Sequence, residues 1–140
     1  MNQGELLTSF LVDLQRIFRT KIISNELSYS QALAILVIPD DGMEMSELAW
    51  VLGLENSTVT RLIARLEANG FVKREKSDFD KRSIIVLLKN KGLIVQKNIE
   101  NKSDKIGQEI FLNDAQSQKE IILENLSLFQ WALKKTFLKR

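Results

Sequence analysis

Apolar residues recur at three- and four-residue spacing in three long stretches of the chain, and this spacing predicts amphipathic helices. The first stretch extends from Leu6 to near Ser24, and the second from about Lys91 to Ile110. The third follows Asn113, whose side chain we expect to cap it. The apolar stripes of these helices are larger than the short middle of the chain can cover. A second copy of the chain would bury them, so we expect a homodimer with twofold symmetry.

The middle of the chain predicts three shorter helices. They are expected over about 30–38, over about 46–52 and over about 57–68. Either Ser28 or Ser30 is expected to cap the first of them.

A hairpin is predicted after these helices. Residues 71–75 and 83–88 are rich in apolar and β-branched side chains and flank the polar turn 76–82, which indicates two strands. A helix followed by a basic hairpin is the layout of a winged helix-turn-helix. We therefore expect a mainly α (α+β) fold with a winged helix-turn-helix at about 30–90. The flanking dimerisation helices would lie at about 1–27 and 91–140.

The charge is unevenly distributed along the chain. The 140 residues have a formal net charge of only +2. Between Arg61 and Lys97, however, ten basic residues stand against four acidic ones. A basic middle between more acidic ends is typical of a surface that contacts phosphates. A solvated charged surface is the alternative interpretation of the same charge.

The absence of two residue types excludes several kinds of chemistry. Without cysteine the chain has no disulfide, thiolate metal site or thiol redox sensor, and without histidine it lacks the commonest general base and zinc ligand. We therefore expect no metal and no cofactor. An enzyme is not expected either, because Asp78 and Asp80 lie in a basic, solvent-exposed turn and not in a visible pocket.

The chain has no stretch that predicts membrane insertion. Its longest uninterrupted apolar run, Ala32 to Ile38, has seven residues, whereas a membrane span needs about 18. The first ten residues contain an acid and no base, which does not fit a secretory signal. We expect a cytoplasmic protein without membrane contact.

The predicted helix at 57–68 has the residue types that a DNA-recognition helix needs. Its outward positions include Asn56, Ser57, Thr58, Thr60, Arg61 and Arg65. Short hydroxyl side chains near a helix N-terminus bond phosphates together with free backbone N–H groups, and an arginine can make a bidentate contact to guanine. Two structural explanations remain open here: Ser57 as only a helix cap, and Arg65 as only a partner for neighbouring acids.

The predicted turn at 76–82 places Lys76, Lys81 and Arg82 at a projecting tip. An arginine there can enter a narrow minor groove, where the potential is more negative. Asp80 has two interpretations: it holds the Arg82 guanidinium in one geometry, or it favours the turn. Phe79 either anchors the loop or is exposed, and the sequence alone leaves this open.

Together these residues resemble the MarR family of bacterial transcriptional regulators. The resemblance rests on the helix-turn-helix at Ser46–Gly70, on the wing with its Asp80-x-Arg82 signature, and on Lys91-Gly92 at the start of the next helix. It spans nearly the whole chain and so implies one MarR-like domain over 1–140. It also implies an obligate homodimer whose terminal helices interlock. It further implies that two winged domains bind double-stranded DNA at a pseudo-palindrome and regulate transcription, and we expect a repressor.

The resemblance also implies roles for the matched positions. The residues in the major groove would be Ser57, Thr58, Thr60, Arg61 and Arg65, with Arg82 at the wing and Asp80 and Arg74 supporting it. The chain has Met45 where the family often has Thr at a helix start, so Ser46 is expected to cap that helix instead. It has Glu55 where the family has the cap of the recognition helix, so Asn56 is expected to take that role.

Many members of the family release DNA when a small aromatic or anionic ligand enters a cleft between the dimer helices and the winged domain. By this analogy Arg16, Arg19 and Trp50 are candidates for lining such a cleft. An exposed helix face and a core indole explain the same residues equally well.

A winged-helix protein-interaction module without DNA binding is the alternative function. Such a module should have a neutral or acidic helix face. Arg61, Arg65 and Arg82 argue against it.

Overall fold

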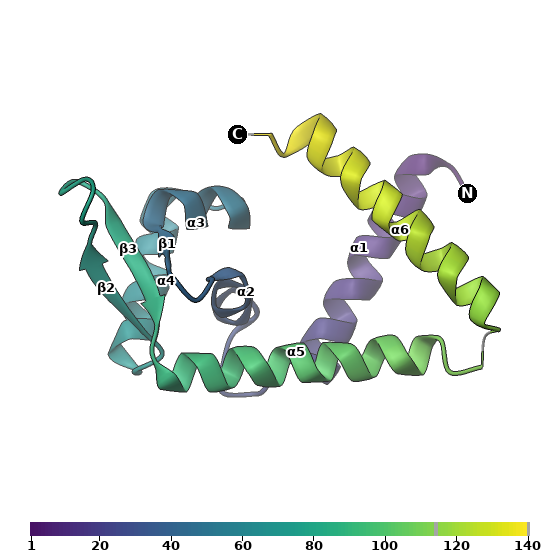
Figure 1. Cartoon of the computed structure of the whole chain (residues 1–140), viewed down its shortest axis with the longest axis horizontal. Helices are drawn as coiled ribbons and strands as arrows, with labels where there is room; N and C mark the ends of the chain where they lie inside the picture. Colours follow the sequence, from purple (N-terminus) through teal and green to yellow (C-terminus); the bar gives the residue numbers. More distant parts are fainter. Residues whose placement is uncertain (114, 140) are drawn as a thin grey trace. The chain divides into compact units, whose positions relative to one another are not determined.

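The structure, a computed structural model, describes residues 1–113 and 115–139. They form two compact units, residues 1–103 and 104–140, and each is described by itself. The elements in chain order are α1 (Gln3–Ile17), the π-helical turn η1 (Phe18–Ile22), α2 (Tyr29–Val37), β1 (Met43–Glu44), α3 (Met45–Leu52), α4 (Asn56–Ala68), β2 (Val72–Lys76), β3 (Ile84–Leu88), α5 (Asn90–Ile110) and α6 (Gln116–Phe137) (Figure 1). The predicted fold class, mostly helical with a small antiparallel sheet, is confirmed.

The helix starts differ from the prediction in two places. α2 begins with a capping box in which Ser28 accepts from the Gln31 N–H, so Ser28 and not Ser30 is the cap. The expected cap of the last helix, Asn113, is wrong. α6 starts at Gln116 with Ala115 at its N-cap position, because residues 111–113 form a turn that ends α5 instead of a helix entry.

The sheet has a third strand that the sequence did not predict. β2 and β3 pair in an antiparallel hairpin from Val72 opposite Leu88 to Lys76 opposite Ile84. β1 adds to the other edge of β3 over only two residues, which is too short for any periodic signal. The preceding Gly42 has a φ of +87°, and a Cβ there would lie 2.9 Å from the Val86 carbonyl oxygen. Glycine therefore lets the chain pass close enough to β3 to pair with it.

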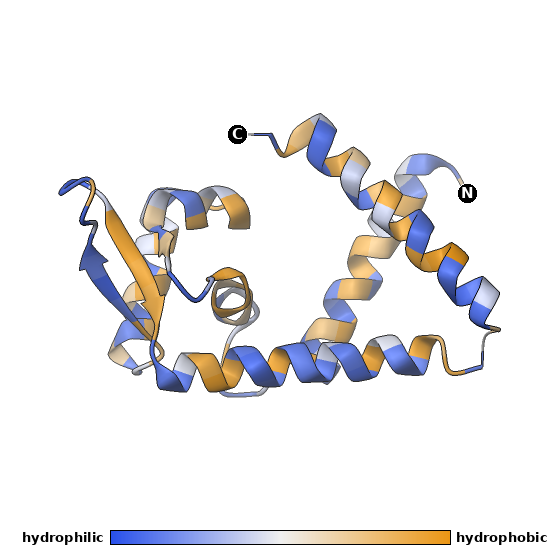
Figure 2. Ribbon diagram, in the orientation of Figure 1, coloured by the Kyte–Doolittle hydropathy of each residue, from blue (hydrophilic) through white to orange (hydrophobic). Residues whose placement is uncertain are grey.

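The core of the first unit lies where α2, α3 and α4 pack together with the sheet. Its largest fully buried side chains are Ile35, Ile38, Leu48, Val59, Ile63, Leu66, Val72 and Val86. Leu62 in α4 is only half-buried. α1 and α6 contain no buried residue, although apolar and polar residues alternate along both (Figure 2). Their apolar stripes are thus exposed in a single chain.

α5 holds the end of α2 through one side chain. The Gln96 amide Nε2 donates to the carbonyl oxygens of Ile35, at 2.9 Å, and Ile38, at 2.8 Å. The last carbonyl groups of a helix have no partner within the helix itself, so they need donors from elsewhere. Gln96 supplies one and so fixes where α2 ends against α5.

Phe71 is the point at which α4, the hairpin and α5 meet. This buried residue donates its N–H to the Leu66 carbonyl, at 2.9 Å, and accepts from the Lys89 N–H, at 3.0 Å. The Lys91 ammonium lies 4.3 Å from the centre of its ring and donates to the Asn69 carbonyl at 2.9 Å. A cation at this end of α4 also complements the helix dipole.

The start of α5 approaches the Phe71 backbone so closely that only glycine fits. A Cβ added at Gly92 would lie 2.3 Å from the Phe71 carbonyl oxygen. That oxygen is already held by the Lys89 N–H and belongs to backbone next to β2, so it cannot shift freely.

We expect Gly92→Ala to lower the free energy of unfolding by about 1–3 kcal/mol, because the added methyl group overpacks this junction. Urea denaturation at a fixed protein concentration measures the change. Gly107→Ala is the matched control in the same helix. No atom lies within 4 Å of its added Cβ, so it should raise the stability by about 0.5–1 kcal/mol. Equal losses in the two variants would show that the contact with Phe71 is unimportant.

Candidate nucleic-acid interface

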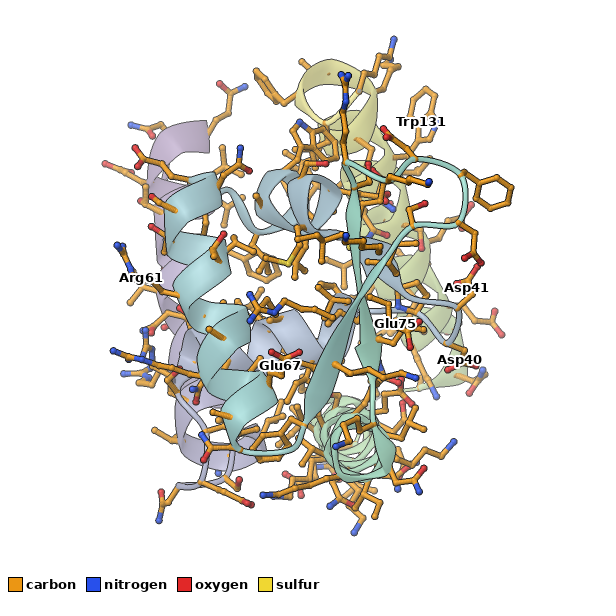
Figure 3. The ribbon with its side chains drawn as sticks, turned by 90° about the vertical axis from the view of Figure 1, so that its left-hand side faces the viewer. Asp40, Asp41, Arg61, Glu67, Glu75 and Trp131 are labelled. Atoms are coloured by element: carbon orange, nitrogen blue, oxygen red, sulfur yellow. The ribbon has the colours of Figure 1, made fainter. Side chains whose placement is uncertain are left out.

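The helix α4 divides cleanly into a buried and an exposed face. Val59, Ile63 and Leu66 are buried in the core of the first unit. The predicted DNA-binding residues Asn56, Ser57, Thr60, Arg61 and Arg65 are exposed, and Thr58 is half-buried. In Figure 3 the Arg61 side chain points away from the sheet and into solvent. α4 therefore has the geometry that a recognition helix requires.

The basic residues of this region fall into two groups. Within the part of the chain that the structure describes, no ion pair forms at Arg61, Arg65, Lys76, Lys81 or Arg82. By contrast, Lys73 pairs with Glu75 at 2.8 Å, and Arg74 is bound to Glu67. The possibility that Arg65 serves only to pair with neighbouring acids is thus not supported. The first group keeps its charge available for an anionic partner.

Both helices of the helix-turn-helix begin without a side-chain cap. The N-cap positions are Glu44 for α3 and Glu55 for α4, and neither makes a side-chain cap hydrogen bond. The expected use of Ser46 and Asn56 as caps is therefore wrong: each lies inside its helix, and Ser57 is not a cap either. The first N–H groups of a helix carry a partial positive charge, and here no side chain of these residues competes for them.

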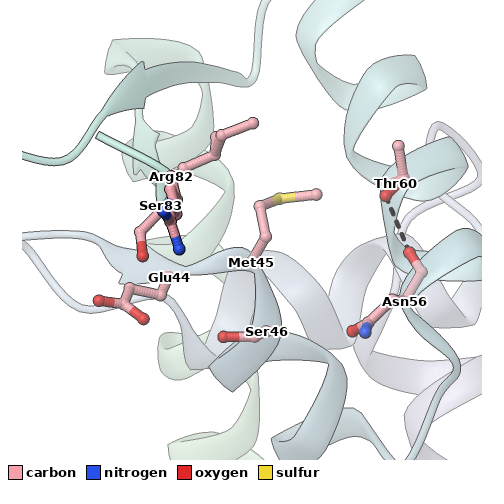
Figure 4. A pocket seen from close by; sticks show the side chains of 8 residues that line it. Glu44, Met45, Ser46, Asn56, Thr60, Arg82 and Ser83 are labelled. Carbon is pink, nitrogen blue, oxygen red and sulfur yellow. Dashed lines mark hydrogen bonds between the residues drawn. The ribbon is translucent and has the colours of Figure 1, made fainter. Parts of the chain in front are cut away.

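A cavity of about 230 Å³ lies where the start of α3, the start of α4 and the wing meet (Figure 4). Its lining residues are Glu44, Met45, Ser46, Asn56, Thr60, Arg82, Ser83 and Ile84. The Thr60 hydroxyl donates to the Asn56 backbone carbonyl at 2.8 Å (Figure 4). The tertiary structure thus gathers Asn56, Thr60 and Arg82 at one hollow.

The wing turn is closed by hydrogen bonds of its own residues. The Ser77 N–H donates to the Ser83 carbonyl at 2.9 Å, and the Asp80 carboxylate accepts from the Arg82 backbone N–H at 3.0 Å and from the Ser83 hydroxyl at 3.4 Å. Asp80 thus shapes the turn, the second of its two interpretations, and does not contact the Arg82 guanidinium. Phe79, which the sequence left open, is exposed.

Two contributors to this region were missed from the sequence. Ser77 is buried, and its hydroxyl accepts from the N–H groups of Phe79 and Asp80. A serine at the start of a turn is a recognised signal for such bonds. Glu67 was counted only as an acid, because its partner Arg74 lies on a different element and no local pattern connects the two.

Glu67 joins α4 to β2. Its carboxylate accepts from the Arg74 backbone N–H at 2.9 Å, from Nε at 3.2 Å and from NH2 at 2.9 Å. In Figure 3 Glu67 lies between α4 and the strands of the wing. These hydrogen bonds from Arg74 hold the pKa of the Glu67 carboxyl below its usual value. Arg74 thus lies where the predicted wing-supporting role needs it.

The three candidate ligand residues are not brought together. Arg16 pairs with Asp13, and the Arg19 guanidinium lies 4.3 Å from the centre of the Tyr29 ring. Trp50 is 42% exposed on α3, so it is not a core indole. None of the three lines the cavities found at the wing, beside α5 or along α1. A ligand site at these residues stays a prediction.

Residues 1–113 and 115–139 offer neither a metal site nor a membrane span. They contain no cluster of three or more acidic side chains arranged to hold a metal ion. No helix in the same ranges combines the length and the apolar character needed to cross a membrane.

Known sequences similar to this chain are transcriptional regulators. Residues 39–84, from the end of α2 to the start of β3, match the model of the MarR family. The transcriptional regulator TtmR of Methylorubrum extorquens is 36% identical over 78 residues, which are 55% of this chain and 40% of that protein. MgrA of Staphylococcus aureus, also a transcriptional regulator, is 27% identical over 95 residues, 66% of this chain and 65% of MgrA. The chain thus spans less than two thirds of the length of either relative.

Solved structures show the same fold over nearly the whole chain. A MarR protein from Peptoclostridium difficile has a TM-score of 0.77 at 20% identity, covering 96% of this chain and 89% of its own. FabT of Streptococcus pneumoniae, solved in complex with DNA, has a TM-score of 0.77 at 22% identity, covering 97% and 96%. The winged helix-turn-helix at residues 39–84 thus matches the MarR family of transcriptional regulators, and nearly the whole chain shares the fold of a MarR protein.

Proposed function

We propose that the chain is a sequence-specific repressor that binds double-stranded DNA as a homodimer at a pseudo-palindromic operator. The observation that carries the proposal is the set of unpaired cations on α4 and the wing, Arg61, Arg65, Lys76, Lys81 and Arg82. Lys73 and Arg74 in β2 are by contrast paired with glutamates, so these two charges are already used within the fold.

The recognition helix supplies the base contacts in this proposal. Arg61 and Arg65 lie one turn apart on the exposed face of α4, where either can reach a guanine in the major groove. The uncapped starts of α3 and α4 would bind backbone phosphates through their N–H groups, with Ser57 and Thr60 beside them. Lys76, Lys81 and Arg82 would follow the adjacent minor groove.

The exposed apolar stripes of α1 and α6 support the homodimer. Large side chains such as Phe10 in α1 and Phe129 and Trp131 in α6 are between 41% and 59% exposed in the single chain. Monomeric proteins rarely expose stripes of this kind, and a twofold partner would cover the same surface on both copies. Two copies would also present two recognition helices, which is why we propose a pseudo-palindromic operator.

Repression is the simpler mode of regulation for such a molecule. A protein that occupies a promoter needs only its DNA-binding surface to exclude the polymerase. A protein-interaction module without DNA binding is the alternative, but it gives no reason for the unpaired cations on α4. An enzyme is not favoured, because Glu67, the carboxyl with the lowered pKa, is occupied by Arg74.

The proposal extends to release of the DNA by a small aromatic or anionic effector. A cavity of about 140 Å³ beside α5 supports this part, because Ile22, Leu27 and Ile99 give it apolar walls. Its charged lining residues are one cation, Lys102, and one acid, Glu26. Apolar walls with a few polar groups suit a small ring.

We expect Arg82→Ala to weaken binding to the operator by on the order of 1 kcal/mol for each wing, because a cation is lost from the groove-facing turn. The dimer should stay folded, since the Arg82 side chain makes no ion pair with the described residues. Fluorescence anisotropy at fixed salt measures the affinity. Lys105→Ala removes an exposed cation outside the winged segment and should have no effect. Equal affinity of Arg82→Ala and the wild-type protein would remove Arg82 from the interface.

The affinity should fall steeply with salt, because unpaired cations that neutralise phosphates release counterions. If the unpaired cations of both protomers engage, up to roughly ten phosphates are contacted, and we expect the slope of log K against log salt to be steeper than about −4. Titrations at four or more salt concentrations give the slope. A flat response would favour the protein-interaction module.

We expect Glu67→Gln to weaken operator binding several-fold, because the ion pair with Arg74 holds the wing against the recognition helix. If Glu67 acted only through its charge, its removal near DNA would strengthen operator binding. A weaker affinity of Glu67→Gln would therefore indicate that Glu67 positions the wing. Glu75→Gln is the matched control: it removes the same charge from a pair within β2 and should not weaken binding. Equal effects of the two variants would contradict the positioning role.

The same ion pair makes a prediction about pH. Because the pKa of Glu67 is lowered in the folded state, its stabilising effect is fully present above the ordinary pKa of a glutamate and is lost as the pH falls through the lowered value. Urea denaturation should therefore separate the wild-type protein from Glu67→Gln near neutral pH and show the difference shrinking in acid. A difference that grows in acid would contradict this assignment.

A further inference from the structure

The wing turn presents an aromatic side chain that the fold does not use. Phe79 is 100% exposed, between β2 and β3. Its ring makes no cation–π contact in the part of the chain that the structure describes. A phenylalanine stabilises a fold by removing apolar area from water, and this one removes none. The folded chain alone therefore gives no reason for an aromatic residue at the tip.

The exposed position of Phe79 is set by an ordered turn. The Phe79 N–H donates to the Ser77 hydroxyl at 3.2 Å, and the Asp80 N–H donates to the same oxygen at 3.4 Å. Ser77 is only 6% exposed, so this acceptor is anchored in the protein. The Asp80 carboxylate then holds the following residues through the Arg82 N–H and the Ser83 hydroxyl. The backbone on both sides of Phe79 is thus constrained, which lowers the entropy lost when the ring binds a partner.

The charges around Phe79 indicate the kind of partner. Lys76, Lys81 and Arg82 lie within three residues of Phe79 in the sequence and form no ion pair among the described residues. The Asp80 carboxylate is instead directed to donors of the turn itself. A fitting partner is anionic and has a flat apolar surface close to its charges. Duplex DNA has both, because stacked bases lie a few ångströms from the phosphates.

We propose that Phe79 is a wedge that enters the minor groove at the flank of the operator and partly unstacks one base step. This inference rests on the proposed DNA-binding function and adds to it a residue that acts through the shape of the DNA. Apolar side chains inserted in this way kink a duplex toward the major groove.

The wedge predicts a sequence preference outside the bases that α4 reads. Pyrimidine–purine steps such as TA and CA are the easiest to unstack, so the operator flank under each wing should contain one. Asp78, the exposed acid next to the ring, opposes close approach to phosphates. Asp78→Asn should therefore tighten binding without changing the unstacking.

The experiment uses the full-length protein and an operator duplex recovered by selection of bound genomic fragments. The adenine analogue 2-aminopurine, whose fluorescence rises when it is unstacked, is placed at successive steps of the flank. Wild-type protein, Phe79→Ala and Phe79→Leu are compared for fluorescence and, by anisotropy at fixed salt, for affinity. Leucine keeps an apolar wedge and alanine removes it.

We expect wild-type protein to raise the fluorescence at one step in each flank and Phe79→Ala to abolish the rise. Phe79→Ala should lower the affinity about tenfold, equivalent to about 1.4 kcal/mol, with the salt slope unchanged because no charge is lost. Phe79→Leu should keep part of both effects. The thermal stability of both variants should equal that of wild type, since the ring is fully exposed.

Failure of the wedge and failure of the proposed function give different results. If wild-type protein binds the operator with a steep salt slope but Phe79→Ala matches it in affinity and fluorescence, only the wedge is wrong. The wedge is also overturned if Phe79→Ala lowers the affinity but saturating wild-type protein does not change the 2-aminopurine fluorescence. If wild-type protein binds no duplex, the DNA-binding function fails and the wedge fails with it.

Discussion

The packing around Phe71 is the constraint on which the rest of the winged domain depends. α4 ends, the hairpin begins and α5 starts within a few residues of this buried side chain. Its N–H bonds back to Leu66, its carbonyl is held by Lys89, and the backbone of Gly92 lies against it. Because one rigid point carries both the recognition helix and the wing, their relative placement follows from packing instead of from loops. The Glu67–Arg74 pair adds a second attachment further along β2.

The distribution of ion pairs separates structural charges from available ones. Three basic residues near the junction have partners: Arg74 has Glu67, Lys91 has the Asn69 carbonyl and Lys73 has Glu75. The basic residues on the outer side of α4 and in the wing turn have none among the described residues. A net charge of only +2 is compatible with a cationic face, because acids elsewhere in the chain balance these bases in the sum. Phe79 adds a fully exposed apolar group to that face.

Elements with a repeating side-chain pattern were predicted well from the sequence, and contacts between distant segments were predicted poorly. The positions of α4 and of both hairpin strands were predicted to within one or two residues, because side-chain spacing repeats over their whole length. β1 was missed because two residues contain no period, and it forms only when Gly42 brings the chain beside β3. The caps at Asn113, Ser46 and Asn56 were wrong for a related reason. A cap depends on the backbone angle at which the chain enters the helix, and the preceding turn sets that angle.

The sequence by itself determined the helix-turn-helix, the basic hairpin and the absence of cysteine and histidine chemistry, since these depend on local order and composition. Only the tertiary structure decided which cations stay unpaired and that Phe79 is exposed. It also decided that Asp80 shapes the wing turn and makes no contact with the Arg82 guanidinium. The physical reason is that an ion pair or a burial depends on the distance between groups from separate elements. Glu67 and Arg74 meet because α4 and β2 are folded back on each other at Phe71.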